Sequence, residues 1–420
     1  MKQVLQHLRT GQIELADVPC PLVRPGHLLV QTSASLISAG TERMLVEFGR
    51  GGLIAKARAQ PEKVRQVLDK IRTDGLLPTM EAVFSRLDEP MPLGYCNAGR
   101  VIEVGRDVTG FAPGDRVVSN GPHAEIVCVP ANLAARIPDG VEDESACFTV
   151  LASIALHGIR LAAPTLGESF VVYGLGLLGQ IAVQLLRAHG CRVLGIDINR
   201  ARCELAERFG AQTVAVGEGA DPVRAAETFS SGRGVDGVII TASAKTDEIM
   251  HQSAQMCRKR GRIVLVGVVG LNLRRSDFYE KELTFQVSCS YGPGRYDAEY
   301  EEKGHDYPLP YVRWTEGRNF EAILDAMAGG GLDVRPLISK VIPHAEAPAA
   351  YDAIVNDSSV LGVVMQYPKG APALSRSTRL RTPPAALPAT SPVVGVIGSG
   401  NFTKLVLLPA LKAAGARLGS

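Results

Sequence analysis

Hydrophobic positions recur at short intervals in the first part of the chain. Up to residue 42 they form β-type runs, QIELADV and HLLVQTSASLI, with Pro25 and Gly26 between them. Residues 43–90 have helical apolar spacing, mixed charge and a proline, Pro61, that suits a helix start. Strand patterns return in GRVIEVG, GDRVVS and AEIVCVP. We therefore expect a small antiparallel barrel with a helical insertion at 43–90.

Helix and strand patterns alternate from about residue 145. Five apolar runs, FVVYG, CRVLGID, TVAVG, GVDGVIITA and GRIVLVGVV, are separated by segments of helix length. This alternation predicts a doubly wound parallel sheet, so the fold class is α/β. Residues 271–310 are rich in Tyr, Gly and charge and interrupt the pattern. A helix over 319–328 and two strands, PLISKVI and LGVVMQY, are predicted to follow.

The last part of the chain has a different pattern. Residues 369–392 are rich in Pro, Ala, Ser and Thr and lack apolar periodicity, which predicts a linker. Residues 393–420 then begin with an apolar run that enters Gly398-x-Gly400. Because one βα unit cannot bury the face of a sheet, we interpret 393–420 as the truncated start of a second Rossmann domain.

Composition narrows the class of protein. The chain is 46% hydrophobic, and 45 basic residues nearly balance 43 acidic ones, which gives no sign of a nucleic-acid or membrane partner. It has no signal-peptide pattern and no apolar run near the about 18 residues of a membrane span, so a soluble, cytoplasmic protein is expected. The eight cysteines contain no C-x-x-C pair, which argues against a disulfide framework or a four-cysteine zinc site.

Residues 169–200 contain the strongest chemical signal. An apolar strand enters Gly174-x-Gly176-x-x-Gly179, an amphipathic helix follows, and a second strand ends at Asp197. This frame is typical of a dinucleotide-binding unit, in which the helix N-terminus binds a pyrophosphate. A carboxylate at Asp197 can accept both ribose hydroxyls and would repel a 2′-phosphate, so NAD(H) is favoured over NADP(H). We expect the cofactor to contact the glycine turn and nearby strand ends: Gly174, Leu175, Gly176, Leu177, Leu178, Gly179, Asp197, Ile198, Arg202, Thr241 and Gly267.

Residues 1–368 resemble the medium-chain dehydrogenase/reductase superfamily. The resemblance rests on PLGYCNAGRVIEVGRDVTGFAPGDRVV, on the AEIVCVP strand and on the nucleotide half. It implies a GroES-like catalytic domain over 1–150, a Rossmann NAD-binding domain over 151–290 and a return to the catalytic domain over 291–368. The superfamily often forms dimers or tetramers, which leaves a homo-oligomer open.

Residues 393–420 resemble the opening strand of Gfo/Idh/MocA-type dehydrogenases. Together with SCSYGPGRYDAEYE, the order of the two modules is similar to that of bi-domain oxidoreductases of bacterial surface-polysaccharide pathways. The resemblance therefore implies a C-terminal Gfo/Idh/MocA-type domain in the full-length protein.

Zinc-using members of the superfamily take ligands from three places. Here the first position holds Ser38 or Ala39, the second holds Tyr95 within Gly94-Tyr95-Cys96, and the third lies near Val150. Catalytic zinc needs three protein ligands, and Cys96 is the one soft donor nearby. The resemblance therefore implies a zinc-independent member with no metal ligands.

Without a metal, another group must manage the proton of the reacting oxygen. Tyr95 stands where the zinc-binding His would be, so its hydroxyl is a candidate donor; the alternative is a packed tyrosine. His123 begins a strand near the same predicted cleft and is a second acid/base candidate, although a lone His is more often structural.

Four more residues are candidates for substrate binding. Thr41 and Glu42 either hold substrate hydroxyls or cap the next helix. Tyr291 and Arg295 lie in a Gly-Pro-Gly turn, and the Arg295 fork suits a carboxylate or phosphate. The alternative for this turn is a surface loop or a subunit contact.

Three functions remain open. The first is an NAD-dependent, zinc-independent oxidoreductase that acts on a hydroxyl or carbonyl of a sugar or nucleotide-sugar substrate. The second is a zinc-free enone or quinone reductase that uses NADPH, against which Asp197 argues. The third is a non-catalytic nucleotide-binding module that supports a second dehydrogenase domain.

Overall fold

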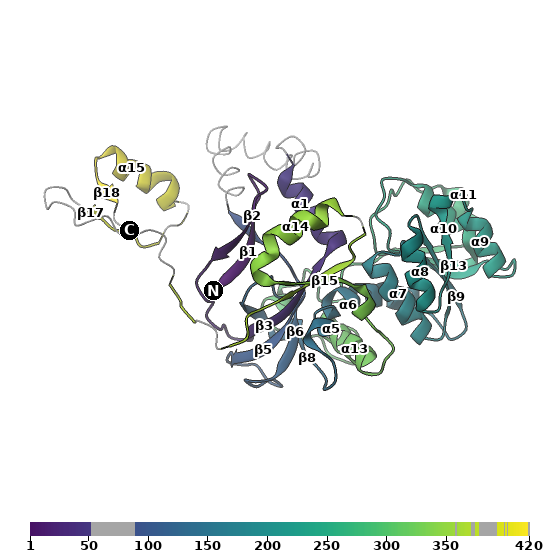
Figure 1. Cartoon of the computed structure of the whole chain (residues 1–420), viewed down its shortest axis with the longest axis horizontal. Coiled ribbons are helices and arrows are strands. Elements are labelled where there is room, and N and C mark those ends of the chain that lie inside the picture. Colours follow the sequence, from purple (N-terminus) through teal and green to yellow (C-terminus); the bar gives the residue numbers. More distant parts are fainter. Residues whose placement is uncertain are drawn as a thin grey trace. The chain divides into compact units, whose positions relative to one another are not determined.

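The computed structural model describes residues 1–51, 89–357, 359–370, 374–377, 393–398, 400 and 402–418. Most of the predicted helical insertion at 43–90 and most of the predicted linker at 369–392 lie outside the described residues. The chain forms two compact units, Met1–Leu374 and Ser375–Ser420. Figure 1 shows both, and each is described by itself.

The N-terminal part is built from two antiparallel sheets. The smaller has the strand order β2 (Ile13–Asp17), β1 (Lys2–His7), β4 (Pro90–Pro92). The larger is centred on β3 (His27–Ser38), which pairs with β5 (Asn97–Val104) and β7 (Ile126–Pro130); β6 (Arg116–Ser119) and β8 (Ala134–Arg136) continue beyond β5. Helix α1 (Ala39–Arg50) follows β3 directly. The strand patterns read from the sequence are thus confirmed in this region.

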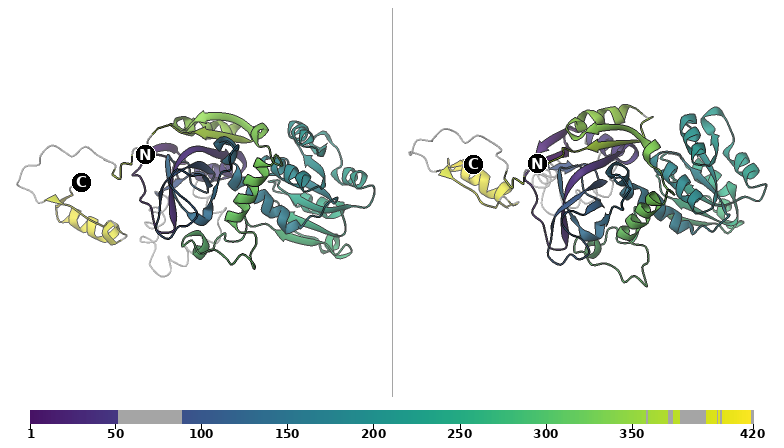
Figure 2. Two further views of the ribbon diagram at one scale, coloured as in Figure 1. Left: turned by 90° about the horizontal axis from the view of Figure 1, so that it is seen from below. Right: turned by 60° about the horizontal axis from the view of Figure 1, so that its bottom comes forward.

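The chain returns to this larger sheet near its end. Strand β16 (Gly362–Gln366) pairs antiparallel with β3, and β15 (Ile338–Pro343) pairs parallel with β16. Helix α14 (Ala347–Asn356) connects them and packs against α1. Figure 2 shows these light-green elements beside the purple β3. Segments about 300 residues apart in sequence therefore meet here.

A third sheet, formed by the middle part of the chain, is parallel throughout. Its order is β11 (Gln212–Ala215), β10 (Arg192–Asp197), β9 (Ser169–Tyr173), β12 (Val235–Ile240), β13 (Cys257–Leu265), β14 (Thr284–Val287). Phe170 and Val172 of β9 belong to one core cluster, whereas Val171 and Tyr173 belong to another. Since neighbouring strand residues face opposite sides, both faces are covered, which confirms the doubly wound α/β prediction.

Helices cover the two faces of this sheet. Those in sequence order are α6 (Thr149–Ala162), α7 (Leu177–Ala188), α8 (Arg200–Arg208), α9 (Pro222–Phe229), α10 (Glu248–Met256) and α11 (Arg275–Tyr279). Two features differ from the sequence prediction. Strand β14 was not predicted, because it is only four residues long, three of them exposed, and lies in a segment rich in Tyr, Gly and charge. Helix α13 (Glu316–Ala328) begins three residues earlier than predicted.

The second unit is small. β17 (Val393–Val394) and β18 (Arg417–Leu418) pair in parallel, and α15 (Leu408–Ala413) lies between them in sequence. Ile397 and Phe402 are exposed, as expected of one βα unit without a full sheet to cover. Its assignment to a second Rossmann domain stays a prediction. Among the described helices, none is both long and apolar enough to cross a bilayer.

Candidate functional site

The glycine turn between β9 and α7 is tightly packed. A Cβ on Gly179 would lie 1.9 Å from the carbonyl oxygen of Gly174, so only glycine lets the helix approach the strand this closely. The Thr241 hydroxyl, at the end of β12, donates to the same carbonyl at 2.5 Å. The turn is therefore held between its own helix and the neighbouring strand.

The space outside the turn is open. A Cβ on Gly176 would meet no heavy atom within 4 Å. Gly176 is the N-cap of α7, whose first N–H groups, including those of Leu177 and Leu178, have no partner within the helix. This combination of open space and unpaired donors fits a pyrophosphate.

Asp197 lies at the end of β10, beside the turn, with a side chain that is almost entirely buried. Its Oδ2 accepts the Leu175 N–H at 2.6 Å, and its Oδ1 accepts the Asn199 N–H at 2.8 Å. Each carboxylate oxygen has a second lone pair for a ribose hydroxyl. The adjacent Ile198 side chain is 75% exposed and offers an apolar surface for a base.

Other predicted cofactor residues surround the same edge of the sheet. Nη1 of Arg202 lies 4.0 Å from Oδ2 of Asp197. Gly267 follows β13 and is packed so closely against β12 that a Cβ would lie 2.1 Å from the Ala242 carbonyl. Sequence reasoning missed Gln180, whose buried amide donates to the carbonyls of Leu175 and Arg202. A single polar residue on an apolar helix face carried no signal for that role.

Glu42 lies in a fully buried polar network of the N-terminal part. Its Oε1 accepts the backbone N–H of Ser38 at 3.0 Å, so it caps the start of α1. Its Oε2 accepts from the Tyr351 hydroxyl of α14 and lies 3.2 Å from His123 Nε2. Of the two roles predicted for Glu42, the structure supports the capping role, since the side chain has no exposed surface for a substrate. The side chain of Thr41 lies outside the described residues.

His123 belongs to the same network. Its Nδ1 lies 2.8 Å from Ser35 Oγ, which in turn lies 2.9 Å from the Tyr367 hydroxyl. With the proton on Nε2, Tyr367 donates to Ser35, Ser35 donates to Nδ1 and Nε2 donates to Glu42, so that every donor has an acceptor. His123 has no exposed surface. The predicted role as an acid/base in contact with substrate is therefore corrected to one inside the protein.

The network lies directly beneath the Gly94-Tyr95-Cys96 turn. Gly94 has φ +88°, and a Cβ there would lie 2.4 Å from the His123 ring. The His123 N–H also donates to the Leu93 carbonyl at 2.8 Å. Tyr95 is half-buried and packs against the main core cluster, with its hydroxyl oxygen buried in the free protein. The network thus determines where the turn that carries Tyr95 lies.

Tyr291 and Arg295 lie in the loop that leaves the carboxyl end of β14. The Tyr291 side chain is buried, and burial raises the pKa of its hydroxyl. Arg295 forms an ion pair with Glu301 through Nη1, and its guanidinium lies 4.3 Å from the centroid of the Tyr296 ring. The predicted role of Arg295 in binding a ligand anion is corrected, because its Nη1 already pairs with an internal carboxylate and its Nε is buried.

The same loop covers an isolated acid, Glu316, at the start of α13. Glu316 has no exposed surface, and neither carboxylate oxygen has a hydrogen-bond partner among the described residues. Burial and the charge of Glu301 raise its pKa to about 9, although Arg295 opposes the shift. Glu316 is therefore a neutral acid at pH 7. This burial could not be predicted from the sequence, because Glu is normal in a first helical turn.

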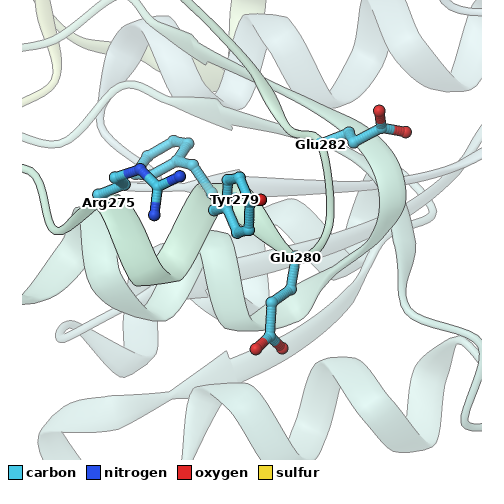
Figure 3. A pocket seen from close by; sticks show the side chains of 5 residues that line it. Arg275, Tyr279, Glu280 and Glu282 are labelled. Atoms are coloured by element: carbon cyan, nitrogen blue, oxygen red, sulfur yellow. The ribbon is translucent and has the colours of Figure 1, made fainter.

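A surface depression lies elsewhere, beside α11. Arg275, Phe278, Tyr279, Glu280 and Glu282 line it. Figure 3 shows the Arg275 guanidinium next to the Tyr279 ring, 3.8 Å from its centroid, whereas Glu280 and Glu282 point in different directions. It is open and contains none of the predicted site residues. The glycine turn is the better candidate for function.

Comparison with known proteins agrees with this geometry. The family model for an alcohol dehydrogenase GroES-like domain matches residues 69–139, and that for a zinc-binding dehydrogenase matches 178–303. D-guloside 3-dehydrogenase of Escherichia coli (strain K12) is 33% identical over 269 residues, which cover 62% of this chain and 72% of that protein. The chain belongs to the zinc-type alcohol dehydrogenase family. As a member of this family of medium-chain dehydrogenases, it is an oxidoreductase.

Solved alcohol dehydrogenases have the same fold. Alcohol dehydrogenase TADH from Thermus sp. ATN1 superposes with a TM-score of 0.67 at 20% identity, covering 88% of this chain and 100% of that one. A zinc-binding dehydrogenase from Sinorhizobium meliloti 1021, solved with bound NADP, gives a TM-score of 0.64 at 23% identity and covers 87% of this chain and 98% of that one. At identities below 25%, the likeness to these structures shows a shared fold alone.

The residues at the family's zinc-ligand positions do not fit a catalytic zinc ion in this chain. Ala39 and Val150 have no ligating atom, and Ser38, the alternative at the first position, has only a buried neutral hydroxyl. Cys96 is fully buried, with a pKa raised well above its ordinary value by burial. Glu42 and His123 are the nearest alternatives, and both are engaged in the buried network. Over the described ranges, no group of three or more His, Cys, Asp or Glu residues could hold a metal.

Proposed function

We propose that this protein is an NAD(H)-dependent, zinc-independent dehydrogenase that acts on a hydroxyl or carbonyl group of a sugar-type substrate. The observation that carries this proposal is the open glycine turn with Asp197 beside it. Family membership supports the redox reaction, and the donor set at Ser38 or Ala39, Tyr95 and Val150 supports metal independence.

The cofactor assignment rests on charge. The α7 N-terminus binds the pyrophosphate, and the free lone pairs of Asp197 accept the ribose hydroxyls. A 2′-phosphate would place its negative charge against a nearly buried carboxylate, which favours NAD(H). Bound NAD⁺ supplies the hydride acceptor. Thr241 and Gln180 keep the turn in the conformation that receives it.

The substrate assignment rests on the relatives. The similar Escherichia coli protein is named a guloside dehydrogenase. We extend a sugar-type substrate, of the kind used in surface-polysaccharide metabolism, to this chain. Tyr95 is the residue proposed to hold the proton of the reacting oxygen, and the network of Glu42 and His123 positions its turn.

The test is a substrate panel with NAD⁺ at saturation. Sugars, sugar alcohols and glycosides are offered, with enones and NADPH as a second arm, and NADH absorbance is followed. We expect turnover of at least one sugar-type substrate and its loss in Asp197→Ala through a raised KM for NAD⁺. Turnover of enones with NADPH, without any reaction of sugars, would contradict the proposal.

A further inference from the structure

Trp314 is held between two arginines. The guanidinium carbon of Arg160, on α6, lies 3.3 Å from the centroid of the indole, and that of Arg313 lies 3.8 Å from it. Two guanidinium groups this close to one centroid cannot share a face, so they lie on opposite faces of the ring. Stacking holds both planar groups in place at a separation set by one aromatic ring.

Neither charge is neutralised within the described part of the chain. Arg160 Nε donates to Asn319 Oδ1 at 2.9 Å, and no described carboxylate pairs with Arg160 or Arg313. Burial and the charge of Arg313 lower the pKa of Arg160 to about 10, and no acid counters them. By contrast, Arg295 and Arg318 of the same segment pair with Glu301 and Asp306. The terminal nitrogens of Arg160 and the whole Arg313 fork are left as donors.

Helix α6 and Asn319 connect Arg160 to elements at the carboxyl edge of the parallel sheet. A Cβ on Gly158, one turn of α6 from its C-terminal end, would lie 2.4 Å from Val266, which follows β13. Asn319, which binds Arg160, also donates from Nδ2 to the Tyr291 carbonyl at 2.9 Å. Tyr291 lies in the loop that leaves the carboxyl end of β14. In open parallel sheets, ligands bind at this edge.

We propose that Arg160 and Arg313 form an oxyanion-binding site at the rim of Trp314, which takes the phosphate or carboxylate group of an acidic sugar substrate. The identity of the anion as part of a substrate rests on the proposed function; the anion site itself does not. Guanidinium forks bind carboxylates and phosphates through paired N–H···O bonds, and an anion at the rim of the ring that contacts both arginines offsets their mutual repulsion. The role that the sequence suggested for Arg295 thereby passes to these two residues.

The site is tested with inorganic phosphate by calorimetric titration of the full chain, with NADH present to occupy the α7 N-terminus. Wild type should bind phosphate saturably, and Arg160→Gln and Arg313→Gln should each weaken binding at least tenfold. Arg335→Gln is the matched control, because Arg335 already pairs with Asp333. Equal phosphate affinity in wild type and both site variants, or no saturable binding in wild type, overturns the site.

Folding and function are separated by two further readings. Arg313 is exposed, so its substitution leaves the core intact, and unchanged NADH affinity in Arg160→Gln shows that α6 is still in place. A sugar phosphate, a sugar acid and the neutral parent sugar are then compared as substrates. KM for the acidic substrate should rise at least tenfold in Arg313→Gln, with KM for the neutral sugar unchanged. If wild type binds phosphate but oxidises no sugar, the proposed function fails and the anion site stands; equal KM changes for both substrates overturn the substrate assignment.

Discussion

Replacing Glu316 by Gln should make the stability of this protein less dependent on pH. The folded-state pKa of Glu316 is about 9, against an ordinary value of 4.5. Between these values the folded chain keeps a proton that the unfolded chain loses, so stability falls as pH rises, by about 1.4 kcal/mol per pH unit. The helix N-terminus favours the carboxylate by only about 0.3–1 kcal/mol, which is too little to reverse this loss of stability with rising pH.

From pH 5.5 to 7.5, Glu316 should therefore remove about 2.7 kcal/mol of folding free energy in wild type and nothing in Glu316→Gln. Urea unfolding of both proteins across this range measures the difference, because all other groups contribute equally to both. Glu302→Gln, which changes an exposed glutamate of the same segment, is the control and should behave as wild type. Parallel pH profiles for wild type and Glu316→Gln would refute the reasoning.

Three further substitutions or treatments test the site. Gly179→Ala should lose both stability and NADH binding, because its Cβ would lie 1.9 Å from a backbone oxygen. Gly176→Ala should keep its melting temperature and lose NADH affinity, because its Cβ would point into the open space where the pyrophosphate binds. Similar behaviour of the two variants would contradict this difference. Glu42→Gln should lower the free energy of unfolding in urea by about 1–3 kcal/mol, since an amide cannot accept from all three donors. The control Glu103→Gln, at an exposed position, should not; equal stability of the two variants would contradict the network. Treatment with a chelator should leave dehydrogenase activity unchanged, and metal analysis should find no stoichiometric zinc; loss of activity that zinc restores would contradict metal independence.

The sequence predicted the secondary-structure elements that are determined by interactions between neighbouring residues. The strand of Phe170 to Tyr173, the glycine turn and the helix after it follow from hydrophobic period and turn chemistry within about 30 residues. The exposed strand Thr284–Val287 did not, because its position at the sheet edge comes from pairing with β13 and not from its own pattern.

Burial of single polar side chains was the information that the sequence lacked. His123 was predicted near a cleft, and Glu42 was predicted to hold substrate hydroxyls or to cap a helix. The two lie close together, and partners more than 200 residues away, Tyr351 and Tyr367, complete a closed network around them. Arg295 was predicted to face a ligand, and Glu301, six residues later, takes its charge. In each case the partner residue is present in the sequence, but its closeness in space could not be predicted from it.

The central claim is that the glycine turn and Asp197 bind NAD(H) in preference to NADP(H). Fluorescence titration of the purified chain with NADH and with NADPH, on wild type and Asp197→Ala, measures it directly. The account predicts that wild type binds NADH at least tenfold more tightly than NADPH and that Asp197→Ala removes most of this preference. Equal or tighter binding of NADPH by wild type, or no binding of either nucleotide, would contradict it.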